Sequence, residues 1–179
     1  ITINLGASLI QNMPVRDIWV NGVNASFTNN GTTTIRYLLL SAGSFTNTGN
    51  FNVNALANYI TANNTTTGMM MGVDSLYNDG TFNNSGTVNV MTFYNLNTMN
   101  NYGTIQGLTT VVDSMFNTGT FLNDAGALLK ADSCMTTNAF INNGVINFNQ
   151  FTNTGSFTNT NYMSIVDMTN TGTYTNQDS

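Results

Sequence analysis

The sequence lacks the residues on which most catalytic chemistry depends. Its 179 residues include no histidine and only one cysteine, one proline and one tryptophan. Without an imidazole there is no Ser-His-Asp or Cys-His arrangement and no typical zinc site. The single cysteine, Cys134, has no partner for an internal disulfide, and we interpret it as a small buried hydrophobic residue. We therefore predict a protein that is not an enzyme and has no catalytic residue, metal or cofactor.

Charge is equally scarce. Charged residues make up 6% of the chain, against about 25% in ordinary soluble domains. The eight acidic residues are all Asp, and the only basic residues are Arg16, Arg36 and Lys130. A net charge of -5 leaves no basic surface for nucleic acid, and no apolar run approaches the ~18 residues of a membrane span. We therefore expect that the protein does not bind nucleic acid and has no membrane-spanning segment.

Asparagine, threonine and glycine are abundant instead. The chain has 33 Asn, 30 Thr and 16 Gly, all of which are weak helix formers. Hydrophobic residues still make up 41% of the chain, which is enough for a core. This composition excludes a helix bundle and favours an all-β scaffold.

A short unit recurs along the chain: a large apolar residue, then Asn, then a Gly that closes a turn. It appears as Phe45-Thr-Asn-Thr-Gly49 and again as Phe151-Thr-Asn-Thr-Gly155. The steps from Gly31 to Gly49 and from Gly86 to Gly103 are 18 and 17 residues. Three strands of about four residues and three corners, where Gly and Asn tolerate a left-handed backbone, fill such a period. We predict a parallel β-solenoid (β-helix) of about 9–10 coils of ~18 residues, roughly 45 Å long.

Equivalent positions of successive coils lie above one another in such a fold. We therefore predict an interior aromatic ladder, with Met99 and Met168 filling gaps, and Asn residues that bond to the Asn of the next coil. Like residues stacked at about 4.8 Å suit Asn and Thr but not Lys or Glu, which explains the low charge. The predicted core ladder consists of Phe27, Phe45, Phe82, Phe116, Phe140 and Phe157.

Residues 1–24 differ from residues 25–179, which we predict to form the solenoid repeats. The first segment lacks the repeated unit and holds the only Pro and the only Trp, so we interpret it as an N-terminal cap or docking strand. The repeat persists to Asn176, and we expect the last coil to be uncapped. The irregular region from Ala55 to Gly72 is interpreted as a loop ejected from one coil.

The repeats resemble those of a known family. The stretches Gly80-Thr-Phe-Asn-Asn-Ser-Gly-Thr-Val-Asn-Val90 and Phe140-Ile-Asn-Asn-Gly-Val-Ile-Asn-Phe148 are similar to repeats of filamentous-haemagglutinin-type adhesins. The resemblance covers roughly residues 25–176, although Phe and Met replace much of the Leu and Ala usual in that family. It implies a right-handed parallel β-helix on the outside of a bacterial cell.

A second resemblance concerns three Asp-Ser pairs. Asp74-Ser75-Leu76, Asp113-Ser114-Met115 and Asp132-Ser133-Cys134 are similar to the O-glycosylation signal of secreted Bacteroidota proteins. This resemblance implies that Ser75, Ser114 and Ser133 carry glycans. The alternative interpretation is that Asp-Ser begins a corner of the repeat.

The leading hypothesis for function is structural: an extracellular bacterial filament subunit that assembles with itself, head to tail, into a homopolymer. The terminal strands would form the contact between subunits. They contain Ile1, Ile3 and Leu5 at one end and Thr173, Tyr174 and Thr175 at the other. The alternative is a fragment of a cell-surface adhesin that binds glycans or a host or solid surface.

Two further hypotheses are weaker. Regular Thr arrays on a flat β-face can order ice, but Thr32–Thr34 and Thr65–Thr67 do not recur at one position in every coil. A polysaccharide-cleaving β-helix needs clustered carboxylates, and the best pair, Asp74 and Asp113, is interpreted as a feature of the repeat.

Overall fold

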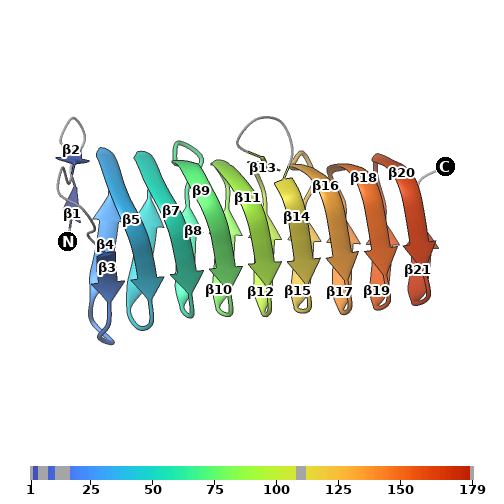
Figure 1. Cartoon of the computed structure of the whole chain (residues 1–179), viewed down its shortest axis with the longest axis horizontal. Helices are drawn as coiled ribbons and strands as arrows, with labels where there is room; N and C mark the ends of the chain where they lie inside the picture. The colour runs from blue at the N-terminus through green and yellow to red at the C-terminus, as the bar shows by residue number, and fades with distance from the viewer. Residues whose placement is uncertain (1, 4–7, 11–16, 108–111, 178–179) are drawn as a thin grey trace.

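The computed structural model describes residues 2–3, 8–10, 17–107 and 112–177, and these residues form an all-β structure without helices. Two sheets of parallel strands face each other along an elongated rod, and the chain passes from one sheet to the other in each coil (Figure 1). Neighbouring strands in each sheet come from successive coils of about 18 residues. The predicted parallel β-solenoid is therefore confirmed, with about nine turns.

One sheet, the short-strand sheet, consists mostly of four-residue strands. Its order is β1 (Thr2–Ile3), β4 (Ser26–Asn29), β6 (Ser44–Asn47), β8 (Thr61–Asn64), β10 (Thr81–Asn84), β12 (Thr98–Asn101), β15 (Thr120–Asn123), β17 (Ala139–Asn142), β19 (Ser156–Asn159) and β21 (Thr173–Asn176).

The other sheet, the long-strand sheet, consists mostly of strands of eight to ten residues. Its order is β2 (Ser8–Ile10), β5 (Thr32–Leu40), β7 (Asn50–Asn58), β9 (Met69–Asn78), β11 (Thr87–Asn95), β13 (Thr104–Gln106), β16 (Leu128–Thr136), β18 (Val145–Asn153) and β20 (Met163–Asn170). In addition, β3 (Asp17–Val20) pairs with β5, and β14 (Val112–Asn117) pairs with β11 and β16.

Each coil holds two strands rather than the three predicted, because the third corner is a bend inside the long strand. In β5, both Arg36 and Tyr37 point outward, which interrupts the alternation of buried and exposed residues. Pairing with β7 nevertheless continues from Ile35 to Tyr37. Two consecutive outward residues therefore turn the chain without breaking the strand, and the Asp-Ser pairs lie at this bend.

The region from Ala55 to Gly72 does not form an ejected loop, so that interpretation was wrong. Most of its residues belong to β7, β8 and β9, and Met70 is fully buried in the core. The irregularity consists of a longer turn at residues 65–68, where the Gly68 amide donates to the Thr65 carbonyl oxygen at 2.9 Å, and of two shifts of register where β9 pairs with β7 and with β11. The one extra residue of β9 is absorbed next to Gly72, whose φ of +69° suits glycine.

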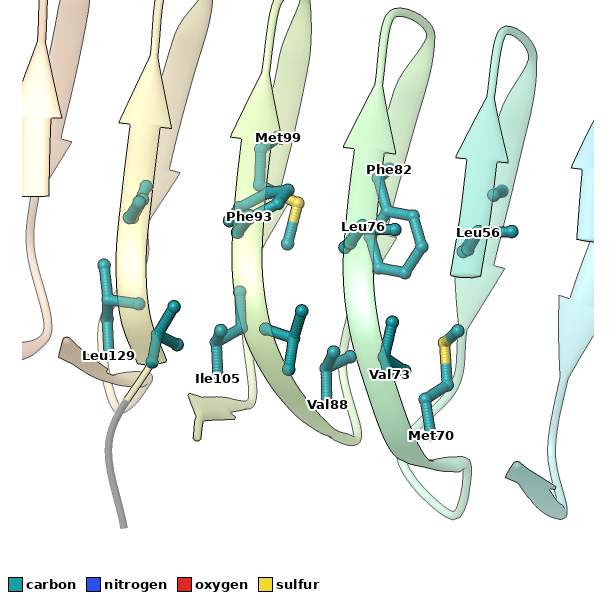
Figure 2. Close-up of a cluster of buried hydrophobic side chains, with 14 of the residues drawn as sticks. Leu56, Met70, Val73, Leu76, Phe82, Val88, Phe93, Met99, Ile105 and Leu129 are labelled. Atoms are coloured by element: carbon teal, nitrogen blue, oxygen red, sulfur yellow. The ribbon is translucent and has the colours of Figure 1, made fainter. Parts of the chain in front are cut away.

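The core lies between the two sheets and is filled by columns of apolar side chains. Figure 2 shows Leu56, Val73 and Leu76 from the long strands and Phe82 and Met99 from the short strands pointing into it. Cys134 is also buried there, and burial raises the pKa of its thiol, so the thiol stays protonated at neutral pH. The interior phenylalanines of the short-strand column are Phe27, Phe45, Phe82, Phe121, Phe140 and Phe157.

Two residues assigned to this column from the sequence lie elsewhere. Phe116 lies on β14, points outward and is 38% exposed, and Phe121 occupies the expected interior place. The reason is parity: the interior Phe residues stand two positions before a buried Asn, whereas Phe116 directly precedes Asn117 and so takes the opposite face. Met168 lies on the long-strand sheet, opposite Phe151.

Candidate functional site: the asparagine ladders and the open last coil

An unbroken ladder of asparagines runs along one corner of the rod, at the last position of each short strand from β4 to β21. Each Nδ2 donates to the Oδ1 of the Asn in the next coil, over 2.6–2.9 Å. All members except the last are buried. This confirms the prediction that Asn stacks on Asn. The members are Asn29, Asn47, Asn64, Asn84, Asn101, Asn123, Asn142, Asn159 and Asn176.

The buried ladder amides also bond to backbone groups at the corners of their own coil and of the next coil. The Nδ2 of Asn84 donates to the carbonyl oxygens of Gly86 and Thr104, at 3.2 and 3.0 Å. The Oδ1 of Asn101 accepts a bond from the amide of Gly103, at 3.3 Å. Buried backbone groups at a chain reversal would otherwise be unpaired, so Asn is required at this position for both the corner and the stack.

A second ladder follows the ends of the long strands. It runs from Asn58 through Asn78 and Asn95 to Asn117, again with every Nδ2 donating to the next coil. Asn117 then donates to the hydroxyl of Thr136 at 2.9 Å, and the ladder resumes with Asn153, which donates to Asn170. Thr136 is therefore the one position between Asn58 and Asn170 where a hydroxyl replaces the amide.

Replacing Thr136 by Asn is expected to raise the free energy of unfolding by about 1 kcal/mol, because an amide restores bonds that a hydroxyl cannot make. The neighbours above and below are Asn117 and Asn153, so the stack has the shape for this side chain. Urea unfolding measures the change. The control, Thr136→Val, keeps the volume but removes the acceptor for Asn117, and it should destabilise by about 1–2 kcal/mol. A neutral or stabilising Val would contradict the role given to the ladder.

The ladders have a direction, and their two ends differ chemically. Every bond in both ladders is donated toward the C-terminal end of the rod. At the N-terminal end, the Oδ1 of Asn29 accepts a bond from the Thr33 hydroxyl at 2.9 Å. At the other end, Asn170 and Asn176 lie on β20 and β21, the last strands of the two sheets. Their amides therefore face a side that no further coil covers among the described residues.

The core is open at the same end. In the last coil, Met163, Ile165 and Tyr174 are only partly buried, and Met168 is 37% exposed. The residues directly below them in β18 and β19 are almost completely buried. Among the described residues, the last coil thus presents strand edges that pair with no further strand, together with the partly exposed end of the hydrophobic core.

The strands predicted to act in assembly lie at the two ends of the rod, as far as they are described. Thr173, Tyr174 and Thr175 belong to β21, where the Tyr174 ring stacks on Phe157 with centroids 5.3 Å apart and planes 10° apart. Ile3 belongs to β1 and lies opposite Asn29. Ile1 and Leu5 lie outside the described residues.

The three serines of the Asp-Ser pairs lie in one column on the outer surface. Ser75, Ser114 and Ser133 are half-buried at the bend of the long strand, with Thr92 between the first two. The Asp beside each serine is exposed, so the pairs mark a bend of the repeat, and O-glycosylation there stays a prediction. Among the described residues no group of three or more Cys, Asp, Glu or His lies together.

Hydroxyl side chains recur at one position of almost every coil, a pattern that was not predicted from the sequence. This position, the first of each short strand, points outward and lies three residues before the ladder Asn. Only Ala139 in β17 departs from the pattern. The hydroxyl face comprises Ser26, Ser44, Thr61, Thr81, Thr98, Thr120, Ser156 and Thr173.

Comparison with known proteins assigns no relative: no family model, curated protein or solved structure matches the chain. The parallel β-solenoid with asparagine ladders is therefore established by the structure itself, without a family assignment. No helix in the described part of the chain is long and apolar enough to cross a lipid bilayer.

Proposed function

We propose that the protein is a structural subunit whose solenoids stack head to tail into an extracellular filament. The observation that carries the proposal is the last coil of the described residues. Its strand edges pair with no further described strand, and they form one surface with Met168 and the amides of Asn170 and Asn176. A parallel strand added to such an edge gains backbone hydrogen bonds and covers apolar area. The resemblance to filamentous-haemagglutinin-type repeats supports a location outside a bacterial cell.

The register within the rod predicts which residues would meet at a junction. If a second copy continues the columns, its β3 follows β20 and its β1 follows β21. Trp19 of the second copy then lies beside Thr169, and Val20 lies beside Asn170, since Trp19 and Val20 hold the same columns as Leu39 and Leu40. Val20 has no side-chain oxygen to accept from Asn170. The junction would therefore rely on backbone pairing and apolar packing, and it would be weaker than the contact between coils of one chain.

Electron microscopy of the purified chain at neutral pH tests the proposal. Head-to-tail stacking predicts long uniform fibres with an axial repeat of about 45 Å, which is the length of about nine coils. Discrete rods of that length at every protein concentration would reject it.

A cysteine pair tests the register of the junction. Strands paired in register lie about 4.8 Å apart, which is within the ~4.4–6.8 Å between Cα atoms that a disulfide spans. The variant Trp19→Cys with Thr169→Cys should therefore form covalent multimers on oxidation. The control, Trp19→Cys with Thr175→Cys, places the second thiol on the opposite sheet of the same coil and should not. Native Cys134 is buried and does not compete. Equal cross-linking of both variants would contradict the proposed register.

Adhesion to a glycan or solid surface is a second candidate, favoured by the hydroxyl face. The hydroxyls of Thr61, Thr81 and Thr120 make no side-chain bond within the described protein, whereas the corner hydroxyls of Thr48 and Thr65 donate to backbone oxygens. An uncharged row of outward hydroxyls, in which at least those of Thr61, Thr81 and Thr120 are free to bind, suits a polar, uncharged and periodic ligand. The test is binding of the rods to insoluble polysaccharide. Loss of binding in Thr81→Tyr, with binding kept in the control Thr92→Tyr on the other sheet, would favour this function.

A further inference from the structure

A row of apolar side chains crosses the outer surface of the long-strand sheet. It occupies the outward position just before the second ladder, one residue per coil from β5 to β16. The row, called the apolar stripe below, consists of Leu39, Ala57, Tyr77, Tyr94, Phe116 and Met135. Its exposed part is Tyr94, Phe116 and Met135, since Leu39 and Tyr77 are half-buried and Ala57 is buried. Tyr59 and Leu96 lie beside it at the adjoining corner and are also exposed. This is an unusual concentration of apolar surface for a protein whose outward positions are mostly Asn, Thr and Ser.

The geometry of the rings decides which kind of partner fits. The rings of Tyr94 and Phe116 stack on each other, with centroids 5.2 Å apart and planes only 8° apart. One face of each ring is therefore covered by the other ring, and the opposite faces lie toward Tyr77 and Met135, the next residues of the column. A sugar ring packs on an aromatic face, so this pair offers no platform for a glycan. An edge-on ridge instead suits the grooves of another ridge with the same spacing.

We propose that the apolar stripe binds the same stripe of a second copy of this chain, so that filaments associate side by side. The spacing along the stripe is that of the coils, and a second solenoid has this spacing by construction. No member of the stripe is charged, and the neighbouring outward column is a row of hydroxyls at Ser75, Thr92, Ser114 and Ser133. Two copies can therefore approach without bringing like charges together on the stripe, and Asp79 at the corner stays at the rim in water.

The exposed apolar area of the stripe is too small for two single subunits to bind stably, so the contact between stripes needs filaments. To this extent the inference rests on the proposed function. Tyr59, Tyr94, Leu96, Phe116 and Met135 are 38–47% exposed. If each offers roughly 200 Å² in full exposure, together they leave about 400 Å² open. A stable pair of proteins buries about 800 Å² on each partner. A single pair of subunits is therefore weakly bound, while a contact repeated along two filaments is strengthened by the high local concentration of each next site.

The stripe also sets a register between filaments. The same column continues as Thr152 in β18 and Thr169 in β20, so the apolar part ends two coils before the open end. Along a filament, apolar segments would alternate with short hydroxyl segments once per subunit. Two filaments bury the most apolar area when their subunits are aligned, which predicts bundles with a common axial repeat.

The experiment compares bundling of the wild-type chain with that of Tyr94→Thr/Phe116→Thr by electron microscopy and turbidity. Threonine already occupies this column in two coils, so the fold accommodates it, and circular dichroism checks that the β-structure is kept. The control, Tyr102→Thr/Tyr162→Thr, removes two exposed aromatic rings that lie at corners outside the stripe. Wild type and control should form bundles, while the stripe variant should form single filaments, with bundles appearing only at a protein concentration at least tenfold higher.

The outcomes separate this inference from the proposed function. Filaments that bundle equally in the stripe variant, or wild-type filaments that never bundle, would overturn the inference and leave head-to-tail stacking intact. If the chain forms only rods, the filament proposal fails, and sedimentation of the concentrated rods then tests the stripe. If wild-type rods pair weakly and the stripe variant needs at least tenfold more protein to pair, the stripe is supported as a self-binding surface. Identical sedimentation of the wild type and the stripe variant would reject it.

Discussion

Replacing Asn101 by Leu should lower the free energy of unfolding by about 3–5 kcal/mol, because it removes a buried group that bonds in both directions along the ladder. Asn101 donates to Asn123 at 2.8 Å and to the Leu128 carbonyl oxygen at 3.2 Å, and it accepts from Asn84 at 2.9 Å. Leucine fits the volume but pairs with none of these groups. Each buried group left without a partner costs about 1–3 kcal/mol.

The adjacent residue provides a matched control for this variant. Asn100 points outward, is half-buried and donates to Asn83 at 2.9 Å. Because water can replace its partner, Asn100→Leu should cost less than about 1 kcal/mol. Urea unfolding gives both values, and hydrogen exchange shows whether the loss spreads beyond the coils next to Asn101, since coils contact mainly their neighbours. Equal losses in the two variants would mean that the ladder bonds contribute little.

Replacing Gly103 by Ala is expected to destabilise the chain by more than about 3 kcal/mol, because the added methyl group would collide with the coil before it. A Cβ at this position would lie far inside van der Waals contact of the Gly86 carbonyl oxygen and close to the backbone of Ser85. Gly103 does not have a positive φ, so the restriction comes from close stacking of corners rather than from its own conformation. The prediction that corner glycines serve a left-handed backbone was therefore wrong for this position.

Gly126 provides the contrasting case. It has a φ of +81°, and a Cβ there would meet open space. Gly126→Ala should cost only about 1–2 kcal/mol of backbone strain, and Gly126→Asn should recover part of it, since Asn tolerates this conformation. Asn at position 103 should be as harmful as Ala. Thermal unfolding of the four variants measures these differences, and a well-tolerated Gly103→Ala would contradict the steric explanation.

The repeat made the fold predictable from the sequence, and the outcome for particular residues shows where that prediction ended. The spacing of the Phe-Asn-Gly units predicted coils of the right length, and the stacking of Asn on Asn followed because like residues recur one coil apart. The scarcity of charge has the same cause, since a column of charges would repel itself. These features depend only on the period, which a sequence displays directly.

The assignment of Phe116 to the core failed because a period does not specify which face a residue takes. Phe116 and Phe121 both precede an Asn and a Gly. They differ only in that Phe116 lies one residue before its buried Asn, whereas Phe121 lies two residues before it. A shift of one residue in a strand moves a side chain from the core to the surface. The apolar stripe was missed for the same reason, since its members belong to different local motifs and share only a column.

The sequence by itself determined that the chain is a charge-poor, asparagine-rich parallel solenoid, because composition and period are properties of the chain alone. Only the tertiary structure decided the direction of the ladders, the steric role of Gly103, and the alignment of Tyr94 with Phe116 on the surface. The physical reason is that coils differ in length by several residues. The residue that lies above another is settled only when bends, corners and register shifts have absorbed those differences.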